Sequence, residues 1–141
     1  MPLAVGTDAP AFTAKDTNGN TVSLSDFAGK TVVLYFYPKD DTPGCTKQAC
    51  SFRDAQPEYQ NKDVVVLGVS ADDEVSHQAF TKKYDLNFPL LADTDKSLIK
   101  AFDVDKRITY VIDPNGKISH VDASVNTTTH ASDVLAALGL S

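Results

Sequence analysis

The stretch Thr31-Val32-Val33-Leu34-Tyr35-Phe36-Tyr37 consists almost entirely of β-branched, aliphatic and aromatic side chains. An apolar run of this length without polar alternation predicts a strand that is buried on both faces of a sheet. Val64–Val69 has the same character and predicts a second buried strand. Between them, Cys45 to about Gln60 has the composition of a helix, which Pro57 is expected to break or restart. A strand–helix–strand unit therefore forms the centre of the predicted fold.

Beyond this unit, strand and helix patterns continue to alternate. Ile108–Ile112 and Ile118–Val121 flank Pro114-Asn115-Gly116, a turn sequence typical of an antiparallel hairpin. Three further helices are expected at Val75–Tyr84, Ser97–Phe102 and Ser132–Leu138, the last of them amphipathic. This order of elements predicts an α/β protein with a thioredoxin-like fold, in which helices flank a central mixed β-sheet.

The composition fits one compact domain over residues 1–141. Hydrophobic residues make up 42% and charged residues 23%, which are ordinary values for a globular protein. No run approaches the roughly 18 apolar residues that cross a bilayer, so no membrane partner is expected. The net charge is −6, and no basic stripe that would attract a phosphate backbone is visible. Nucleic-acid binding is therefore not expected.

The first residues and the histidines exclude other classes of protein. Met1-Pro2-Leu3-Ala4-Val5-Gly6 lacks the basic start and apolar region of a secretory signal, so a cytoplasmic location is expected. His77, on a polar helix face, and His130, in a threonine-rich loop, are expected at the surface or as helix caps. His120 likewise has no neighbouring ligand at a metal-binding spacing. Neither a metal nor a cofactor is predicted.

Two cysteines are too few for a disulfide scaffold or a four-cysteine zinc site. Thr42 is a good N-cap and Pro43 then occupies the first helical position, which places Cys45 in the first turn of the helix. Unpaired N–H groups and the helix dipole favour an anion there, and helix N-termini lower the pKa of thiols. The position predicts a nucleophile at Cys45. The alternative is that Cys45 is only a small buried hydrophobic residue.

Cys50 lies five positions after Cys45, so the pair is not the Cys-x-x-Cys of a dithiol reductase. Five residues of α-helix rotate about 140° and rise about 7.5 Å, which separates the two Cα atoms by about 8.7 Å. A disulfide needs Cα atoms within about 7 Å. If the two sulfurs join, the first turns of the helix must therefore unwind. The alternative is that Cys50 is an inert core residue.

Pro38-x-x-x-Thr42-Pro43-Gly44-Cys45-Thr46 is similar to the active-site motif of the peroxiredoxin family. The following Ala49-Cys50-x-Phe52-Arg53-Asp54 resembles the Q-type subfamily, whose members are also called bacterioferritin comigratory proteins. Further similarity runs from Gly6-Thr7-Asp8-Ala9-Pro10-Ala11-Phe12 to Arg107-x-x-Tyr110-Val111-Ile112-Asp113. The resemblance thus covers nearly the whole chain.

The resemblance implies a thiol-dependent peroxidase without a cofactor. Cys45 would attack a hydroperoxide and become a sulfenic acid, and Cys50 would then form a disulfide with it. A thioredoxin or similar dithiol would reduce that disulfide. The resemblance also assigns supporting roles. Thr42 would hydrogen-bond the thiolate and the peroxide, and Arg107 would steady the thiolate and polarise the O–O bond. Pro38 and Pro43 would shield the sulfenate, and Gly44 would lie beside the substrate. Taken alone, Arg107 at a strand start would instead be a surface ion-pair partner.

Gln48 departs from the family pattern, which usually has glutamate three residues after the attacking cysteine. Glutamine can still accept a hydrogen bond from an arginine, but it carries no charge to orient that arginine. We therefore expect activity to survive, with Gln48 in the substrate-binding part of the site and Arg107 less firmly held.

Two other functions remain compatible with the sequence. One is a thioredoxin-like disulfide reductase, although the chain lacks Cys-x-x-Cys. The other is a non-catalytic thioredoxin-fold binding module, although both cysteines stand in an intact proline and threonine frame. Because both cysteines lie on one predicted helix, a monomer would suffice for closing the disulfide.

Overall fold

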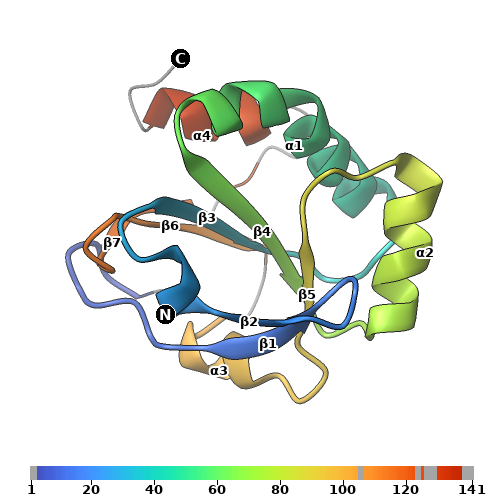
Figure 1. The fold of residues 1–141 in the computed structure, drawn as a ribbon, viewed down its shortest axis with the longest axis horizontal. Helices are drawn as coiled ribbons and strands as arrows, with labels where there is room; N and C mark the ends of the chain where they lie inside the picture. The colour runs from blue at the N-terminus through green and yellow to red at the C-terminus, as the bar shows by residue number, and fades with distance from the viewer. Residues whose placement is uncertain (1–2, 105–106, 123–124, 126–129, 138–141) are drawn as a thin grey trace.

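The computed structural model describes residues 3–104, 107–122, 125 and 130–137. Seven strands form one mixed sheet in the order β2-β1-β5-β4-β3-β6-β7, with helices on both faces (Figure 1). The strands are β1 Thr13–Asp16, β2 Thr21–Ser23, β3 Thr31–Phe36, β4 Val64–Ser70, β5 Leu90–Ala92, β6 Ile108–Ile112 and β7 Ile118–Asp122. The helices are η1 Leu24–Phe27, α1 Pro43–Asn61, α2 Glu74–Tyr84, α3 Ser97–Ala101 and α4 His130–Ala137. The predicted α/β class and central mixed sheet are confirmed.

Strand β3 lies at the centre of the sheet, as its apolar sequence predicts. It pairs parallel with β4 on one side and antiparallel with β6 on the other. Successive side chains of a strand point to opposite faces. Val33 and Tyr35 therefore join the core under α1, α2 and α4, whereas Val32 and Leu34 join the core on the opposite face, which includes α3. Burial on both faces explains the unbroken apolar run.

The hairpin and most helix boundaries agree with the predictions within about two residues, as is usual for element ends. β6 and β7 pair antiparallel, and Gly116 in the connecting turn has a positive φ of 81°. Asp73 caps α2, since its carboxylate accepts from the N–H of Ser76 at 2.9 Å. α4 begins at His130, two residues earlier than expected; the predicted end at Leu138 lies outside the described residues.

The prediction that Pro57 breaks or restarts the helix is wrong, because α1 continues through it. Proline has no N–H, so the carbonyl of Arg53, four residues earlier, loses its helical donor. The side-chain amide of Asn87 donates to this carbonyl at 3.2 Å. The substitute donor, together with an exposed position for the proline ring, lets the helix run on.

The N-terminal strands β1 and β2, the η1 turn and the short β5 were not predicted. β1 has the sequence TAKD and alternates between exposed and half-buried residues, so it carries no apolar signal. It is held by pairing with β2 and β5 rather than by its own composition. Within the described residues, no helix is both long and apolar enough to cross a membrane.

Candidate active site

The first turn of α1 lies directly after the loop that leaves the central strand β3. Thr42 takes the N-cap position with an extended backbone (φ −95°, ψ 155°), and Pro43 follows at the first helical position. Cys45 is the third residue of the helix, and only 1% of it is exposed. The predicted placement of the thiol in the first helical turn is confirmed.

The side chain of Thr42 does not act as the predicted cap. Its hydroxyl donates to the carbonyl of Lys39 at 3.0 Å, while its own carbonyl accepts the first helical bond from Thr46. The threonine therefore fixes the turn before the helix instead of pairing with a helical N–H. This leaves N–H groups of the first turn available to a negatively charged atom.

Arg107 reaches Cys45 from the start of β6. Because β6 pairs with β3, the sheet brings residue 107 back beside the end of β3 and the start of α1. One terminal nitrogen of the guanidinium, Nη2, lies 3.4 Å from the sulfur of Cys45. The other, Nη1, donates to Oε1 of Gln48 at 2.6 Å. The two terminal nitrogens of Arg107 thus contact the sulfur of Cys45 and the amide oxygen of Gln48, which lies one helical turn further on.

Gln48 is fully buried and lies on the same face of α1 as Cys45, three residues away. Its oxygen holds Arg107, as expected of a glutamine in this position. Its amide nitrogen has no hydrogen-bond partner among the described residues. Since buried donors are nearly always paired, this nitrogen is available to an oxygen atom that enters the site.

Cys50 lies further along the same unbroken helix and is half-buried. Both cysteines are free thiols, in keeping with the separation of about 8.7 Å that helical geometry imposes on their Cα atoms. The structure therefore represents a reduced arrangement in which the two sulfurs cannot bond.

Of the remaining predicted site residues, Pro43 and Pro38 are exposed and Gly44 is half-buried at the mouth of the helix. Pro38 also borders a largely apolar pocket of about 280 Å³. That pocket lies against the end of β3 and against α3, with Phe36, Val69 and Ile99 in its lining, and Cys45 is not part of it. The pocket thus belongs to the opposite side of the sheet from the buried thiol.

Tyr35 was not predicted as part of the site, because in the sequence it is one more apolar strand residue. It packs in the same core as Cys45 and stacks on Phe52 of α1, with ring centroids 4.8 Å apart. Burial and, to a lesser degree, the nearby sulfur of Cys45 raise the pKa of Tyr35 well above its ordinary value. The phenol therefore stays neutral, and its ring packs against the first turns of α1.

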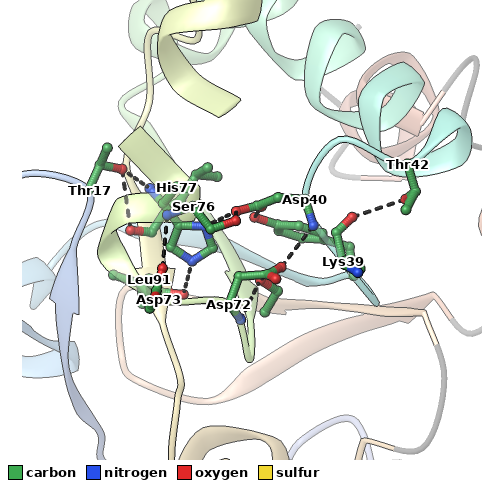
Figure 2. A network of polar contacts seen from close by, with 12 residues as sticks. Thr17, Lys39, Asp40, Thr42, Asp72, Asp73, Ser76, His77 and Leu91 are labelled. Atoms are coloured by element: carbon green, nitrogen blue, oxygen red, sulfur yellow. Dashed lines mark hydrogen bonds and ion pairs between the residues drawn. The ribbon is translucent and has the colours of Figure 1, made fainter. Parts of the chain in front are cut away.

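The prediction that His77 lies at the surface is wrong. His77 is fully buried, with Nδ1 2.6 Å from Oδ2 of Asp40 and Nε2 3.0 Å from the carbonyl of Leu91 (Figure 2). Asp40 belongs to the loop just before Thr42, so this contact joins α2 to the active-site loop. A helical pattern cannot reveal such a partner, because it depends on how α2 packs against a loop 37 residues away.

The surface prediction for His130 is also wrong. This residue is the first of α4 and is fully buried, with Nε2 2.7 Å from Oγ1 of Thr109. Burial lowers its pKa to about 4, partly opposed by the carboxylate of Asp122 at 3.7 Å. His120 is half-buried in the edge strand β7. In the part of the chain that the structure describes, no cluster of metal-ligating residues is present.

The chain is similar to known proteins along most of its length. The family model described as the AhpC/TSA family matches residues 5–121. Peroxiredoxin Q of the chloroplast of Triticum aestivum is 49% identical over 84% of this chain. A protein of Coxiella burnetii provisionally named peroxiredoxin bcp is 44% identical over 98% of this chain and 100% of its own length.

A solved structure shares the fold as a whole. The bacterioferritin comigratory protein of Xanthomonas campestris, studied for its alkyl peroxide reduction, has a TM-score of 0.91 and 34% identity. The match covers 96% of this chain and 98% of that one. The chain spans 58% of the length of the wheat chloroplast relative but the full length of the Coxiella protein.

Proposed function

This chain belongs to the AhpC/TSA family, and on that premise we propose that it is a thiol-dependent peroxidase that reduces hydrogen peroxide and organic hydroperoxides through Cys45. The observation that carries the proposal is the position of Arg107, whose guanidinium contacts the sulfur of Cys45 at 3.4 Å in the first turn of α1. A fixed cation and a helix N-terminus converge on one buried sulfur. Both favour a thiolate over a thiol.

In the first step, the thiolate of Cys45 attacks one peroxide oxygen. A sulfur–oxygen bond forms, the O–O bond breaks, and the leaving alkoxide or hydroxide takes up a proton to become an alcohol or water. The sulfur is oxidised to a sulfenic acid and the peroxide is reduced by two electrons. Negative charge moves from sulfur to the leaving oxygen, and the donors of Arg107 and the free amide of Gln48 lie where they can stabilise that charge.

In the second step, the thiolate of Cys50 attacks the sulfenic sulfur of Cys45. A disulfide forms and hydroxide leaves as water. Because the intact helix separates the two Cα atoms by about 8.7 Å, the first turns of α1 unwind before the bond closes. A neutral sulfenic acid no longer attracts Arg107 as a thiolate does, which favours this unwinding.

The cycle closes when an external dithiol attacks the disulfide and restores both thiols, with thioredoxin as the reductant that the family resemblance implies. A monomer in the cytoplasm is the form that we propose. Its support is that both cysteines lie on one helix and that dithiol reductants maintain a reducing cytoplasm.

Stopped-flow measurement of peroxide consumption tests the proposal. The wild-type chain should reduce hydrogen peroxide for many cycles with thioredoxin, and Cys45→Ser should abolish the reaction. An insulin-reduction assay separates the alternative of a disulfide reductase, since the wild-type chain should leave insulin intact. Unimpaired peroxide reduction by Cys45→Ser would overturn the proposal.

A further inference from the structure

The loop between β3 and α1 contains a buried carboxylate that the proposed chemistry does not use. Asp40 is 7% exposed, and three side chains surround its two oxygens (Figure 2). The hydroxyl of Tyr37 donates to Oδ1 at 2.6 Å, and the hydroxyl of Ser76 donates to Oδ2 at 2.8 Å. His77 contacts the same Oδ2 at 2.6 Å. Two of the three partners belong to α2, so one side chain ties the loop to that helix.

The hydrogen-bond pattern defines the partner of each polar atom around Asp40. Nε2 of His77 faces the carbonyl of Leu91, which can only accept, so Nε2 carries a proton. Burial, together with the neighbouring Tyr35 and Asp40, raises the pKa of Tyr37 well above its ordinary value, so the phenol keeps its proton and donates. Nδ1 of His77 and Oδ2 of Asp40 lie 2.6 Å apart, so a short hydrogen bond joins the two side chains.

The backbone of the same loop is held as well. The N–H of Asp40 donates to Oδ2 of Asp72 at 2.8 Å, and the hydroxyl of Ser70 donates to that same oxygen. The next residue, Asp41, has a left-handed φ of 58° and accepts from Lys83 and Tyr84 near the end of α2. The loop is therefore anchored to α2 and to the end of β4 directly before Thr42.

The other side of the cysteine pair is anchored too. Oγ of Ser51 accepts from the N–H of Ala131 in α4 at 3.1 Å. Arg53 donates through Nη1 to the carbonyl of Tyr84 at 2.6 Å, and Asn87 donates to the carbonyl of Arg53. Residues 42–50, which contain both cysteines, thus lie between two anchored ends. Within this segment, Cys45 and Gln48 are held by Arg107.

We infer that Asp40 is a positioning residue of the proposed peroxidase: through Ser76 and His77 it holds the loop before α1 and thereby sets how readily the first turns of α1 unwind. It acts on the reaction only through the loop and does not touch the reacting atoms. This inference rests on the proposed function of Cys45 and Cys50. With the anchor in place, Cys45 is held against Arg107 for attack, and the segment refolds after each disulfide is reduced. Without the anchor, the population of molecules with unwound first turns of α1 increases.

The sulfenic acid of Cys45 has two possible fates. Cys50 can convert it to a disulfide with loss of water, or a second hydroperoxide can oxidise it to a sulfinic acid while being reduced to an alcohol or water. The first route needs the unwound segment and the second does not. A looser anchor should therefore slow the first attack on peroxide, speed disulfide formation, and protect against over-oxidation.

Asp40→Asn tests this inference, because it keeps the size of the side chain and removes its charge. Asp8→Asn is the control, since it makes the same change at an exposed carboxylate, which pairs with Lys117 at 2.8 Å outside this loop. Each full-length variant is cycled with thioredoxin over a range of hydrogen peroxide concentrations, and mass spectrometry measures the sulfinic fraction. For Asp40→Asn, the peroxide concentration giving half over-oxidation should rise about tenfold, the factor expected for loss of one charge-assisted hydrogen bond. For Asp8→Asn it should stay within about twofold of wild type, as for an exposed ion pair.

Urea unfolding of each variant measures any general loss of stability. Such a loss would not change the ratio of disulfide formation to over-oxidation. If Asp40→Asn does not fold, His77→Gln takes its place with the same criterion. The inference would be overturned if the folded Asp40 or His77 variant turned over at the wild-type rate with an unchanged ratio of disulfide formation to over-oxidation. The proposed function would then remain intact. Absence of peroxide consumption by the wild-type chain would instead overturn the proposed function.

Discussion

The guanidinium of Arg107 lies 3.4 Å from the sulfur of Cys45, although 62 positions separate the two residues in the sequence. The antiparallel pairing of β6 with β3 creates this contact, because it places the start of β6 beside the start of α1. The second arm of the same guanidinium rests on Gln48. A buried thiol, a cation and an amide are thus held by two elements of the central fold.

The first prediction concerns the fork of Arg107. Arg107→Lys keeps the positive charge but cannot contact Cys45 and Gln48 through two fixed nitrogens. The second-order rate constant for hydrogen peroxide should fall by about 100-fold, the lower end of the range for loss of one preorganised donor. Stopped-flow kinetics measure it. Lys117→Arg, which keeps the charge of an exposed cation paired with Asp8, should stay within about twofold of wild type, since exposed ion pairs contribute little. Equal losses in both variants would contradict a specific role for Arg107.

The second prediction separates the two functions of Gln48. Gln48→Leu removes the acceptor for Arg107 and the free amide, so the rate constant should fall about tenfold, as for loss of a hydrogen bond to a charged group. Gln48→Glu keeps an acceptor and should retain activity. Gln56→Leu is the control, because Gln56 is also buried on α1 but bonds the carbonyl of Phe52. If Gln48→Leu reacts as fast as wild type, glutamine at this position does not orient the arginine.

The third prediction concerns Cys50. Cys50→Ser retains the attacking sulfur but has no partner for the sulfenic acid. It should consume about one equivalent of peroxide, accumulate a sulfenic acid that a dimedone probe captures, and stall with thioredoxin. Cys45→Ser should consume none and bind no probe. Normal cycling of Cys50→Ser with thioredoxin would show that another group resolves the sulfenic acid.

The fold was predictable where the sequence pattern reflects burial directly. The apolar run of β3 indicates a strand covered on both faces, and Thr42-Pro43 indicates the start of α1. β1 could not be predicted, because its stability comes from pairing with β2 and β5 and its side chains alternate between exposed and half-buried positions. The prediction of a helix break at Pro57 was wrong for a related reason, because the substitute donor, Asn87, lies on another segment of the chain.

In the site, too, some residues are predictable from local sequence and others depend on tertiary packing. Cys45 and Cys50 are predictable from local spacing, because a helix fixes their positions relative to each other. The partner of His77 is not, because the side chain fills a gap between α2 and a loop and pairs there with Asp40. Buried polar contacts of this kind depend on tertiary packing, and a polar residue on a helix carries no sign of them in sequence.

The fourth prediction is a pH dependence of stability from His130. Burial lowers its folded pKa to about 4, against an ordinary value of 6.5. The unfolded chain therefore binds a proton first as the pH falls, so this contribution is present above pH 6.5 and is lost as the pH falls toward 4. Between pH 7.5 and pH 5 the loss from this group should be about 2 kcal/mol of the free energy of unfolding.

Urea unfolding at the two pH values measures this loss. His130→Gln removes the titrating group, so its free energy of unfolding should fall by about 2 kcal/mol less than that of wild type. His120→Gln changes a half-buried histidine of β7 and should retain the wild-type pH dependence. Identical pH dependence of wild type and His130→Gln would contradict a neutral, buried His130.

The intact mass of the peroxide-treated chain under non-reducing conditions tests most directly the claim that a buried thiolate reacts first and then bonds to Cys50 after its helix unwinds. With one equivalent of hydrogen peroxide, the monomer should lose the mass of two hydrogens, and peptide mapping should join Cys45 to Cys50. An unchanged mass, a lasting gain of one oxygen, or a disulfide between two chains would contradict it.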